Sequence, residues 1–153
     1  MKPRAPLAAA LTLLLAGCAG GGAPEGVGRV TAAATTDTYS IRVGNCTGKL
    51  DTETTDKLAL VPCTDKHHWE AFAVSNLPGD DFPGNAEVRD QATKACTPAF
   101  ESFIGIASED SRYELTLLTP TKETWTQAGD REVVCLVGSS SGGLTGSLKG
   151  VAE

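Results

Sequence analysis

Three residues near the middle of the chain carry side chains that can ligate zinc. Cys63, His67 and Glu70 follow the spacing Cys-x3-His-x2-Glu, and His68 adjoins the first histidine. A usable zinc site needs four convergent ligands, or three and a water. Because we expect a disulfide to consume Cys63, we predict no metal or cofactor. The favoured interpretation is that His67 and Glu70 hydrogen-bond the turn between two strands, with ligand binding as the alternative.

A second pattern resembles a serine nucleophile motif. Residues 138–142, Gly-Ser-Ser-Ser-Gly, fit Gly-x-Ser-x-Gly with Ser140 as the nucleophile. That motif requires a strand, a sharp turn and then a helix in a large parallel sheet, whereas here the turn leads into more glycine. The segment is therefore interpreted as a flexible Ser/Gly tail.

An aromatic residue beside a charged pair forms the third candidate. Trp125, with Asp130 and Arg131, could stack on a sugar or a peptide, since tryptophan and arginine are favoured binding residues. The chain has only two Trp, two Tyr and four Phe, so its core is short of large side chains. We therefore favour Trp125 as a core anchor and Asp130 with Arg131 as a pair that stabilises a turn.

The N-terminus has the features of an export signal. A short basic region precedes an uncharged apolar stretch at residues 7–16, about half the length that a spanning helix needs. The residues that follow, Leu15-Ala16-Gly17-Cys18, resemble the bacterial lipobox. We predict that residues 1–17 are a lipoprotein signal peptide and that Cys18 becomes the lipid-bearing first residue.

The charge of the mature chain limits the classes of partner that it can bind. Removing Lys2 and Arg4 with the signal peptide leaves 11 basic and 19 acidic residues, a formal net charge of −8. Such a surface repels phosphate backbones and anionic headgroups, so nucleic acid is not an expected partner. The expected membrane contact is the lipid on Cys18, at the outer face of the cytoplasmic membrane.

Setting Cys18 aside leaves four cysteines for two disulfides: Cys46, Cys63, Cys96 and Cys135. Three connectivities are possible. We favour Cys46 with Cys63, on neighbouring extended segments, and Cys96 with Cys135, which would join a helix to the strand it covers. Loops of 17 and 39 residues would contribute about 3 and about 4 kcal/mol.

The chain divides into a tether and one domain. Residues 18–38 are rich in glycine, alanine and threonine, and about 20 flexible residues have a reach of about 25 Å. Residues 39–153 are expected to form a single extracytoplasmic domain. Short apolar or alternating runs predict strands at residues 39–43, 58–61, 70–74, 113–117 and 132–137.

A longer segment has helical periodicity. Asn85 is placed to cap its first turn and Gly105 to end its last. Pro98 predicts either a kink or two helices, the second capped by Thr97. The apolar residues that recur at three and four are Val88, Ala92, Ala95, Ala99 and Phe103.

Together these elements predict an α+β fold stabilised by disulfides. A small antiparallel sheet of four to five strands carries one main helix on a face. A short helical turn at residues 122–127 would place Trp125 inward. Residues 139–147 are expected to be loop or tail, although Leu144 and Leu148 could pack as a final short strand.

The order of several short motifs resembles the actinobacterial septum formation domain. The resemblance covers nearly all of the chain from Val43 onward. It implies an exported, usually membrane-anchored domain associated with the cell-division septum, and it implies no catalytic residues. The motifs are Val43-Gly44-Asn45-Cys46, residues 61–70 from Val61 to Glu70, Phe82-Pro83-Gly84, Ala95-Cys96 with Phe100, Pro120-Thr121 with Trp125, Gly129-Asp130-Arg131 leading to Cys135, and residues 144–149.

We therefore expect a non-enzymatic, lipid-anchored binding or accessory domain that acts with an envelope or division protein. The alternative is an envelope hydrolase or metal-dependent enzyme that uses His67 and Glu70. A third possibility, a receptor for a soluble ligand, needs a pocket of about 300 Å³ or more.

Overall fold

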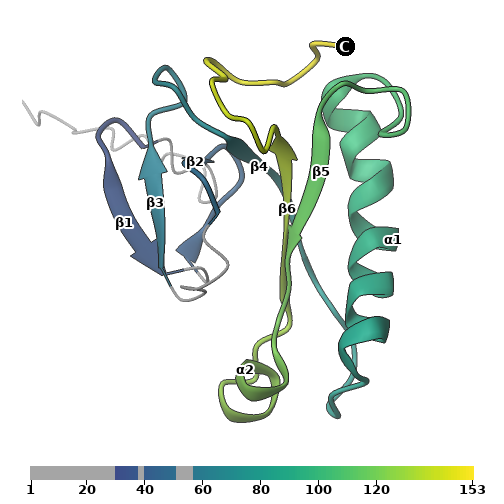
Figure 1. Cartoon of the computed structure of the whole chain (residues 1–153). Coiled ribbons are helices and arrows are strands. Elements are labelled where there is room, and N and C mark those ends of the chain that lie inside the picture. The colour runs from purple at the N-terminus through teal and green to yellow at the C-terminus, as the bar shows by residue number, and fades with distance from the viewer. Residues whose placement is uncertain (1–29, 38–39, 51–56) are drawn as a thin grey trace, which may run out of the picture.

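The computed structural model describes residues 30–37, 40–50 and 57–153 (Figure 1). One antiparallel sheet of six strands runs in the order β1-β3-β2-β4-β6-β5. The predicted signal peptide, the predicted lipidation site Cys18 and most of the predicted tether lie outside the described residues. The elements are β1 (Ala34–Asp37), β2 (Cys46–Thr47), β3 (Lys57–Val61), β4 (Trp69–Asn76), α1 (Asn85–Ile104), β5 (Glu114–Leu118), α2 (Lys122–Gln127) and β6 (Glu132–Gly138).

The α+β class is confirmed, but the sheet has six strands where four to five were predicted. Two strands were not predicted: β2, and β1, which lies within residues 18–38, ahead of the domain boundary predicted at residue 39. Strand β1 pairs antiparallel with β3 from Ala34 opposite Leu60 to Asp37 opposite Lys57. Its sequence, Ala-Thr-Thr-Asp, lacks large apolar residues, which is why the hydrophobic pattern did not indicate a strand.

The strand predicted at residues 39–43 is wrong for residues 40–43, and Tyr39 lies outside the described residues. Ile41 is fully buried, but it belongs to a loop that crosses one face of the sheet. Gly44 turns this loop with a φ of 88°, and its N–H donates to the carbonyl of Ala71. The apolar alternation at residues 39–43 therefore reflects the burial of Ile41 in a loop. The strand β2 contains only Cys46 and Thr47.

Helix α1 is one continuous helix rather than two (Figure 1). Its N-cap is Gly84 without a side-chain hydrogen bond, so the prediction of an Asn85 cap is wrong. Gly105 ends the helix in the left-handed conformation, as predicted. Pro98 is exposed, and water can bond the carbonyl that its missing N–H leaves free. The buried stripe is Val88, Ala92, Cys96, Phe100 and Ile104.

Both faces of β6, which lies between β4 and the edge strand β5, are covered. Val133, Cys135 and Val137 pack in the cluster beneath α1, whereas Val134 and Leu136 pack in a second cluster with Ile41. A strand that is buried on both faces reads as a continuous apolar run, which β6 does. The tail, residues 139–153, lies along the end of the sheet beside α1, where Leu148 joins the cluster beneath the helix (Figure 1).

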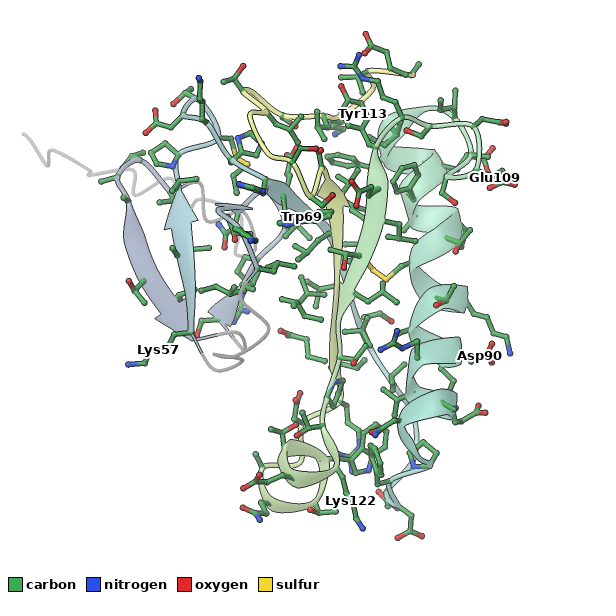
Figure 2. The ribbon with its side chains drawn as sticks, viewed as in Figure 1. Lys57, Trp69, Asp90, Glu109, Tyr113 and Lys122 are labelled. Atoms are coloured by element: carbon green, nitrogen blue, oxygen red, sulfur yellow. A yellow bond between two sulfur atoms is a disulfide. The ribbon has the colours of Figure 1, made fainter. Side chains whose placement is uncertain are left out.

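Two disulfides link these layers, with the pairing that the sequence favoured. Cys46 and Cys63 join β2 to the turn after β3 across a sequence separation of 17 residues. Cys96 and Cys135 join α1 to β6 across 39 residues, seen as the yellow bond beside the helix in Figure 2. Neither helix of the described residues is long and apolar enough to span a membrane.

Candidate functional site

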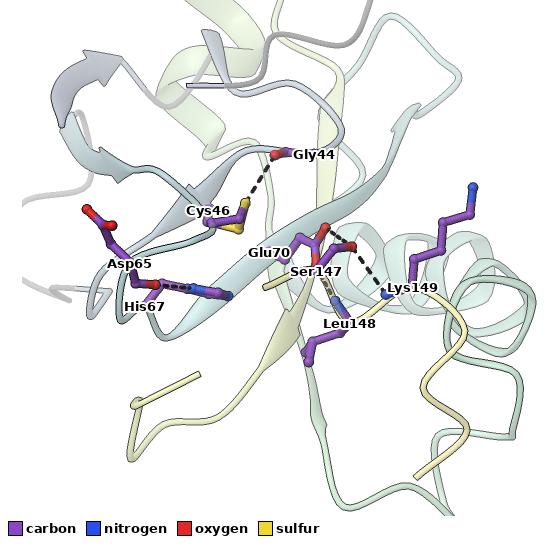
Figure 3. Close-up of a disulfide and its surroundings, with 9 residues drawn as sticks. Gly44, Cys46, Asp65, His67, Glu70, Ser147, Leu148 and Lys149 are labelled. Carbon is purple, nitrogen blue, oxygen red and sulfur yellow. Dashed lines mark hydrogen bonds between the residues drawn. A yellow bond between two sulfur atoms is a disulfide. The ribbon is translucent and has the colours of Figure 1, made fainter. Parts of the chain in front are cut away.

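Glu70 is a buried acidic residue at the junction of β2, β4 and the tail. It lies on β4 opposite Cys46 and is 3% exposed. One carboxylate oxygen accepts a hydrogen bond from the Ser147 hydroxyl and the other from the Leu148 amide, each at 2.7 Å (Figure 3). Both donors come from the tail, 77 and 78 residues further along the chain. The carboxylate therefore holds the tail against the sheet.

The Cys46–Cys63 disulfide lies beside this carboxylate (Figure 3). The two Sγ atoms and a Glu70 carboxylate oxygen all lie within 4.8 Å of one another. The sequence grouped Cys63 and Glu70 with His67, but the described structure brings Cys46 into this cluster instead. We call Cys46, Cys63 and Glu70 the disulfide–carboxylate cluster.

His67 stabilises the turn before β4. Its side chain is 1% exposed, and Nδ1 donates to the Asp65 carbonyl at 3.0 Å. Its backbone pairs with Leu144 of the tail in both directions, at 2.9 and 3.1 Å. This is an isolated bridge, so Leu144 and Leu148 do not form the alternative final strand. His67 and Glu70 are both buried and each makes a hydrogen bond within the fold, whereas the second His67 ring nitrogen, Nε2, is buried without a hydrogen-bond partner.

The Gly-x-Ser-x-Gly segment follows β6 and leads into the tail rather than into a helix. The exposed Ser140 donates its hydroxyl to Glu114 on β5 at 2.8 Å, and its backbone N–H donates to the same oxygen at 3.0 Å. The backbone hydrogen bond, followed by the hydroxyl bond, lowers the pKa of the Glu114 carboxyl. Because the segment leads into the tail, it lacks the strand–turn–helix arrangement that the serine nucleophile motif requires.

Trp125 and Arg131 form a packed pair near α2. Trp125 is 1% exposed, and its indole Nε1 donates to the Asp80 carbonyl at 3.0 Å. The Arg131 guanidinium lies 3.8 Å from the centre of the indole ring and donates to the carbonyls of Gly79, Asp80, Trp125 and Asp130. The pair fixes the turn around residue 80 onto the domain, so the arginine is committed to backbone contacts.

Asp130 stabilises the turn before β6. Its two carboxylate oxygens accept from the Glu132 amide and the Thr124 hydroxyl, both at 3.0 Å. A surface groove of about 530 Å³ runs beside this turn, lined by Asn76, Leu77 and residues 128–132. Burial raises the pKa of the Glu132 carboxyl there, and the positive charge of Arg42 opposes the shift. Asp130 and Arg131, which help to line the groove, already use their side chains for contacts within the fold.

Comparison with known proteins identifies the family. A sequence model described as septum formation matches residues 18–135, which is more than half of the chain. The chain belongs to the septum formation family. The match contains Cys46, Cys63 and Glu70, but it ends before the tail residues that Glu70 binds.

Two curated proteins of Mycobacterium tuberculosis are similar to this septum formation domain. They come from strains CDC 1551 and H37Rv, and each is named an uncharacterized membrane protein. Each is 26% identical over 92 residues, which cover 54% of this chain and 20% of the relative. The matched part thus spans about one fifth of the curated relatives. No solved structure matches this chain.

Several residues that shape the septum formation domain around Glu70 and His68 were not predicted from the sequence. Cys46 and Ser147 meet Glu70 only through long-range pairing. Gly138 lies so close to β4 that a Cβ there would overlap the carbonyl oxygen of His68. Gly142, with a φ of 70°, packs against the His68 imidazole in the same way. The two glycines of the serine motif are therefore required for close approach of the chain.

Replacing Glu70 with glutamine tests how firmly the tail is held. A glutamine side chain carries no charge, and its amide nitrogen cannot accept the hydrogen bond that the carboxylate receives from Ser147 or Leu148. Losing one bond to a buried charged acceptor is expected to reduce the free energy of unfolding by about 2 kcal/mol. Urea denaturation measures the loss, and amide hydrogen exchange at Leu148 should become faster.

The matched control is Glu101→Gln, since Glu101 is exposed on α1. This variant should keep the wild-type urea midpoint and the wild-type exchange rate at Leu148. A wild-type exchange rate in Glu70→Gln would show that the carboxylate does not hold the tail.

Proposed function

We propose that this protein is a lipid-anchored binding or accessory domain of the cell envelope, attached through Cys18 at the outer face of the cytoplasmic membrane. Its partner would be a protein of the envelope or of the division machinery, and its role would be recognition rather than catalysis. Membership of the septum formation family and relatives named membrane proteins fit an envelope-associated role. The lipid anchor and the binding role are the parts that we propose.

One observation carries the proposal: the four cysteines of the described residues are paired in two disulfides. Disulfides persist in oxidising compartments outside the cytosol, where small exported domains use them to supplement limited cores. The fifth cysteine, Cys18, follows Leu-Ala-Gly at the end of an apolar segment. A lipid on this residue would explain both the odd cysteine and the absence of a basic membrane-binding patch in an acidic chain.

Replacing Cys18 with serine tests the anchor. The variant should leave the membrane fraction, because the expected lipid is the only membrane contact that we propose. Membrane fractionation with immunoblotting measures the distribution, and Cys18→Ala should behave in the same way. Retention of Cys18→Ser in the membrane fraction would show that another segment anchors the protein.

Affinity purification from crosslinked envelopes tests the partner. The wild-type protein should capture an envelope or division protein that a tag-only control does not capture. Localisation of the tagged protein away from division sites would separate an envelope role from a role at the septum.

A further inference from the structure

The disulfide–carboxylate cluster combines two sulfur atoms and a buried acid at ligand distances. Cys46 is fully buried, whereas Cys63 is partly exposed in the turn after β3, so solvent and reductants can approach this bridge. The Glu70 oxygen and both Sγ atoms lie within 4.8 Å of one another (Figure 3). Among the described residues, this is the group of cysteine, histidine and acidic side chains that could hold a metal ion.

The sulfur atoms of a disulfide carry no charge and bind metals weakly, since the metal ligand is the thiolate. A dithiol reductant changes this chemistry. It transfers two electrons and two protons to the Cys46–Cys63 bridge, the S–S bond breaks, and the reductant leaves as its own disulfide. Two thiols and one carboxylate then face one another.

We propose that the reduced Cys46–Cys63 pair binds one Zn²⁺ through both sulfur atoms and the Glu70 carboxylate, with a water as the fourth ligand. Binding releases the two thiol protons to solvent, because the ligands are thiolates. A disulfide oxidant takes two electrons from the two thiolates and is itself reduced to two thiolates, so the Cys46–Cys63 bond forms again and Zn²⁺ is released. The disulfide–carboxylate cluster thus holds either a disulfide or a zinc ion.

The distances suit this metal. Zinc bonds of about 2.3 Å to sulfur and about 2.0–2.2 Å to oxygen place tetrahedral ligand atoms about 3.5–3.8 Å apart. A Glu70 oxygen is within 4.8 Å of both sulfurs, so the carboxylate must approach them by up to about 1 Å, and the larger change is separation of the two sulfur atoms. Cys63 provides it, because it lies in a turn rather than within a strand.

Glu70 can bind zinc and keep its hold on the tail. An ionised carboxylate has about four lone-pair positions, and Ser147 and Leu148 occupy two of them. Hydrogen bonds to a ligating carboxylate fix its orientation and strengthen a metal site. The tail therefore supplies the outer shell of the zinc site as well as the contact already described.

The second disulfide provides an internal comparison. Cys96 and Cys135 are at most 1% exposed beneath α1. Among the described residues, no third ligating side chain joins them in a metal-binding group. Mild reduction should therefore open the Cys46–Cys63 bridge first, and only that bridge should yield a zinc site.

Metal titration of the full chain tests the proposal. Cys18 is replaced by serine so that no other free thiol competes, and differential alkylation with mass spectrometry identifies the reduced cysteines. After mild reduction, the protein should bind one equivalent of Zn²⁺ in competition with a chromophoric chelator. Co²⁺ should give a sulfur-to-metal charge-transfer band with tetrahedral d–d absorption. The oxidised protein should do neither.

Variants assign the ligands. Replacing Cys46 and Cys63 with serine should abolish binding, whereas Glu70→Gln should weaken it at least tenfold. The matched control Glu101→Gln should leave the affinity unchanged. Equal affinity in Glu70→Gln, or binding that survives in the double serine variant, would overturn the proposal.

The fold of the reduced protein is measured beside the titration. Near-ultraviolet circular dichroism should show native packing after reduction, and Zn²⁺ should raise the melting temperature of the reduced wild type but not of the double serine variant. A reduced protein that is unfolded and that Zn²⁺ does not refold would also refute the site, because the three ligands converge only in the folded chain.

Discussion

Replacing both Cys96 and Cys135 with alanine is expected to lower the free energy of unfolding by about 4 kcal/mol, since the bridge closes a loop of 39 residues. The bridge ties α1 to β6, a strand buried on both faces, and both cysteines are buried in the main core cluster. A loss of this size is comparable with the whole stability of a marginal domain. Urea denaturation followed by far-ultraviolet circular dichroism measures it.

The other bridge provides the control. Replacing Cys46 and Cys63 with alanine opens a loop of 17 residues, so the expected loss is about 3 kcal/mol. The variant without the Cys96–Cys135 bridge should therefore unfold at the lower urea concentration. The reverse order, or a loss below about 1 kcal/mol for the longer loop, would contradict the loop-closure explanation.

Trp125→Ala is expected to cost about 3–5 kcal/mol, the range for truncating a buried aromatic side chain. The indole fills the space between α2 and the turn around residue 80, with the Phe82 ring 5.7 Å away and the Arg131 guanidinium 3.8 Å away. Removing it leaves a cavity and deprives Arg131 of its stacking surface. Thermal and urea denaturation of the purified variant measure the loss.

Trp125→Phe separates packing from the indole hydrogen bond. Phenylalanine keeps an aromatic ring but cannot donate to the Asp80 carbonyl, so its cost should be nearer 1–2 kcal/mol. Equal losses in the alanine and phenylalanine variants would mean that the hydrogen bond, rather than the buried ring, carries the contribution of this residue.

The fold was predictable where a residue's neighbours in sequence determine its environment. The apolar run of β6 and the inward position of Trp125 both follow from local patterns. Gly105 ends α1 because its left-handed backbone needs no side chain. The prediction of Val88 and Ala92 in the buried stripe of α1 is confirmed, but the rest of the stripe was predicted one residue too early, since Ala95 and Ala99 are small enough to lie at the margin of the core.

Two of the errors have different physical causes, one in long-range strand pairing and one in the backbone conformation at a helix end. Strand β1 contains no large apolar residue, so only its pairing with β3 defines it as a strand. Asn85 has the side chain of a good cap, but Gly84 occupies the capping position with a φ of 102°. The spacing of residues in the sequence indicated neither the strand β1 nor the Gly84 cap.

The same limit applies to the candidate site. The spacing of Cys63, His67 and Glu70 suggested that the three act together, because they are close in sequence. The sheet instead pairs Glu70 with Cys46 through β2, and the tail brings Ser147 to the carboxylate. Those contacts depend on the topology of the whole domain, which residue types and spacing do not encode.

The positions of the disulfides also determine how the domain would respond to a mechanical pull. Force applied from the N-terminal side of residue 30 reaches β1 first, where only four residue pairs resist it. Once β1 has peeled away, the Cys46–Cys63 bond prevents the chain between those two residues from stretching. The Cys96–Cys135 bond likewise protects β5 and α2, which lie inside its loop. An envelope protein built in this way would yield a short, recoverable extension at its edge strand while its core stays intact.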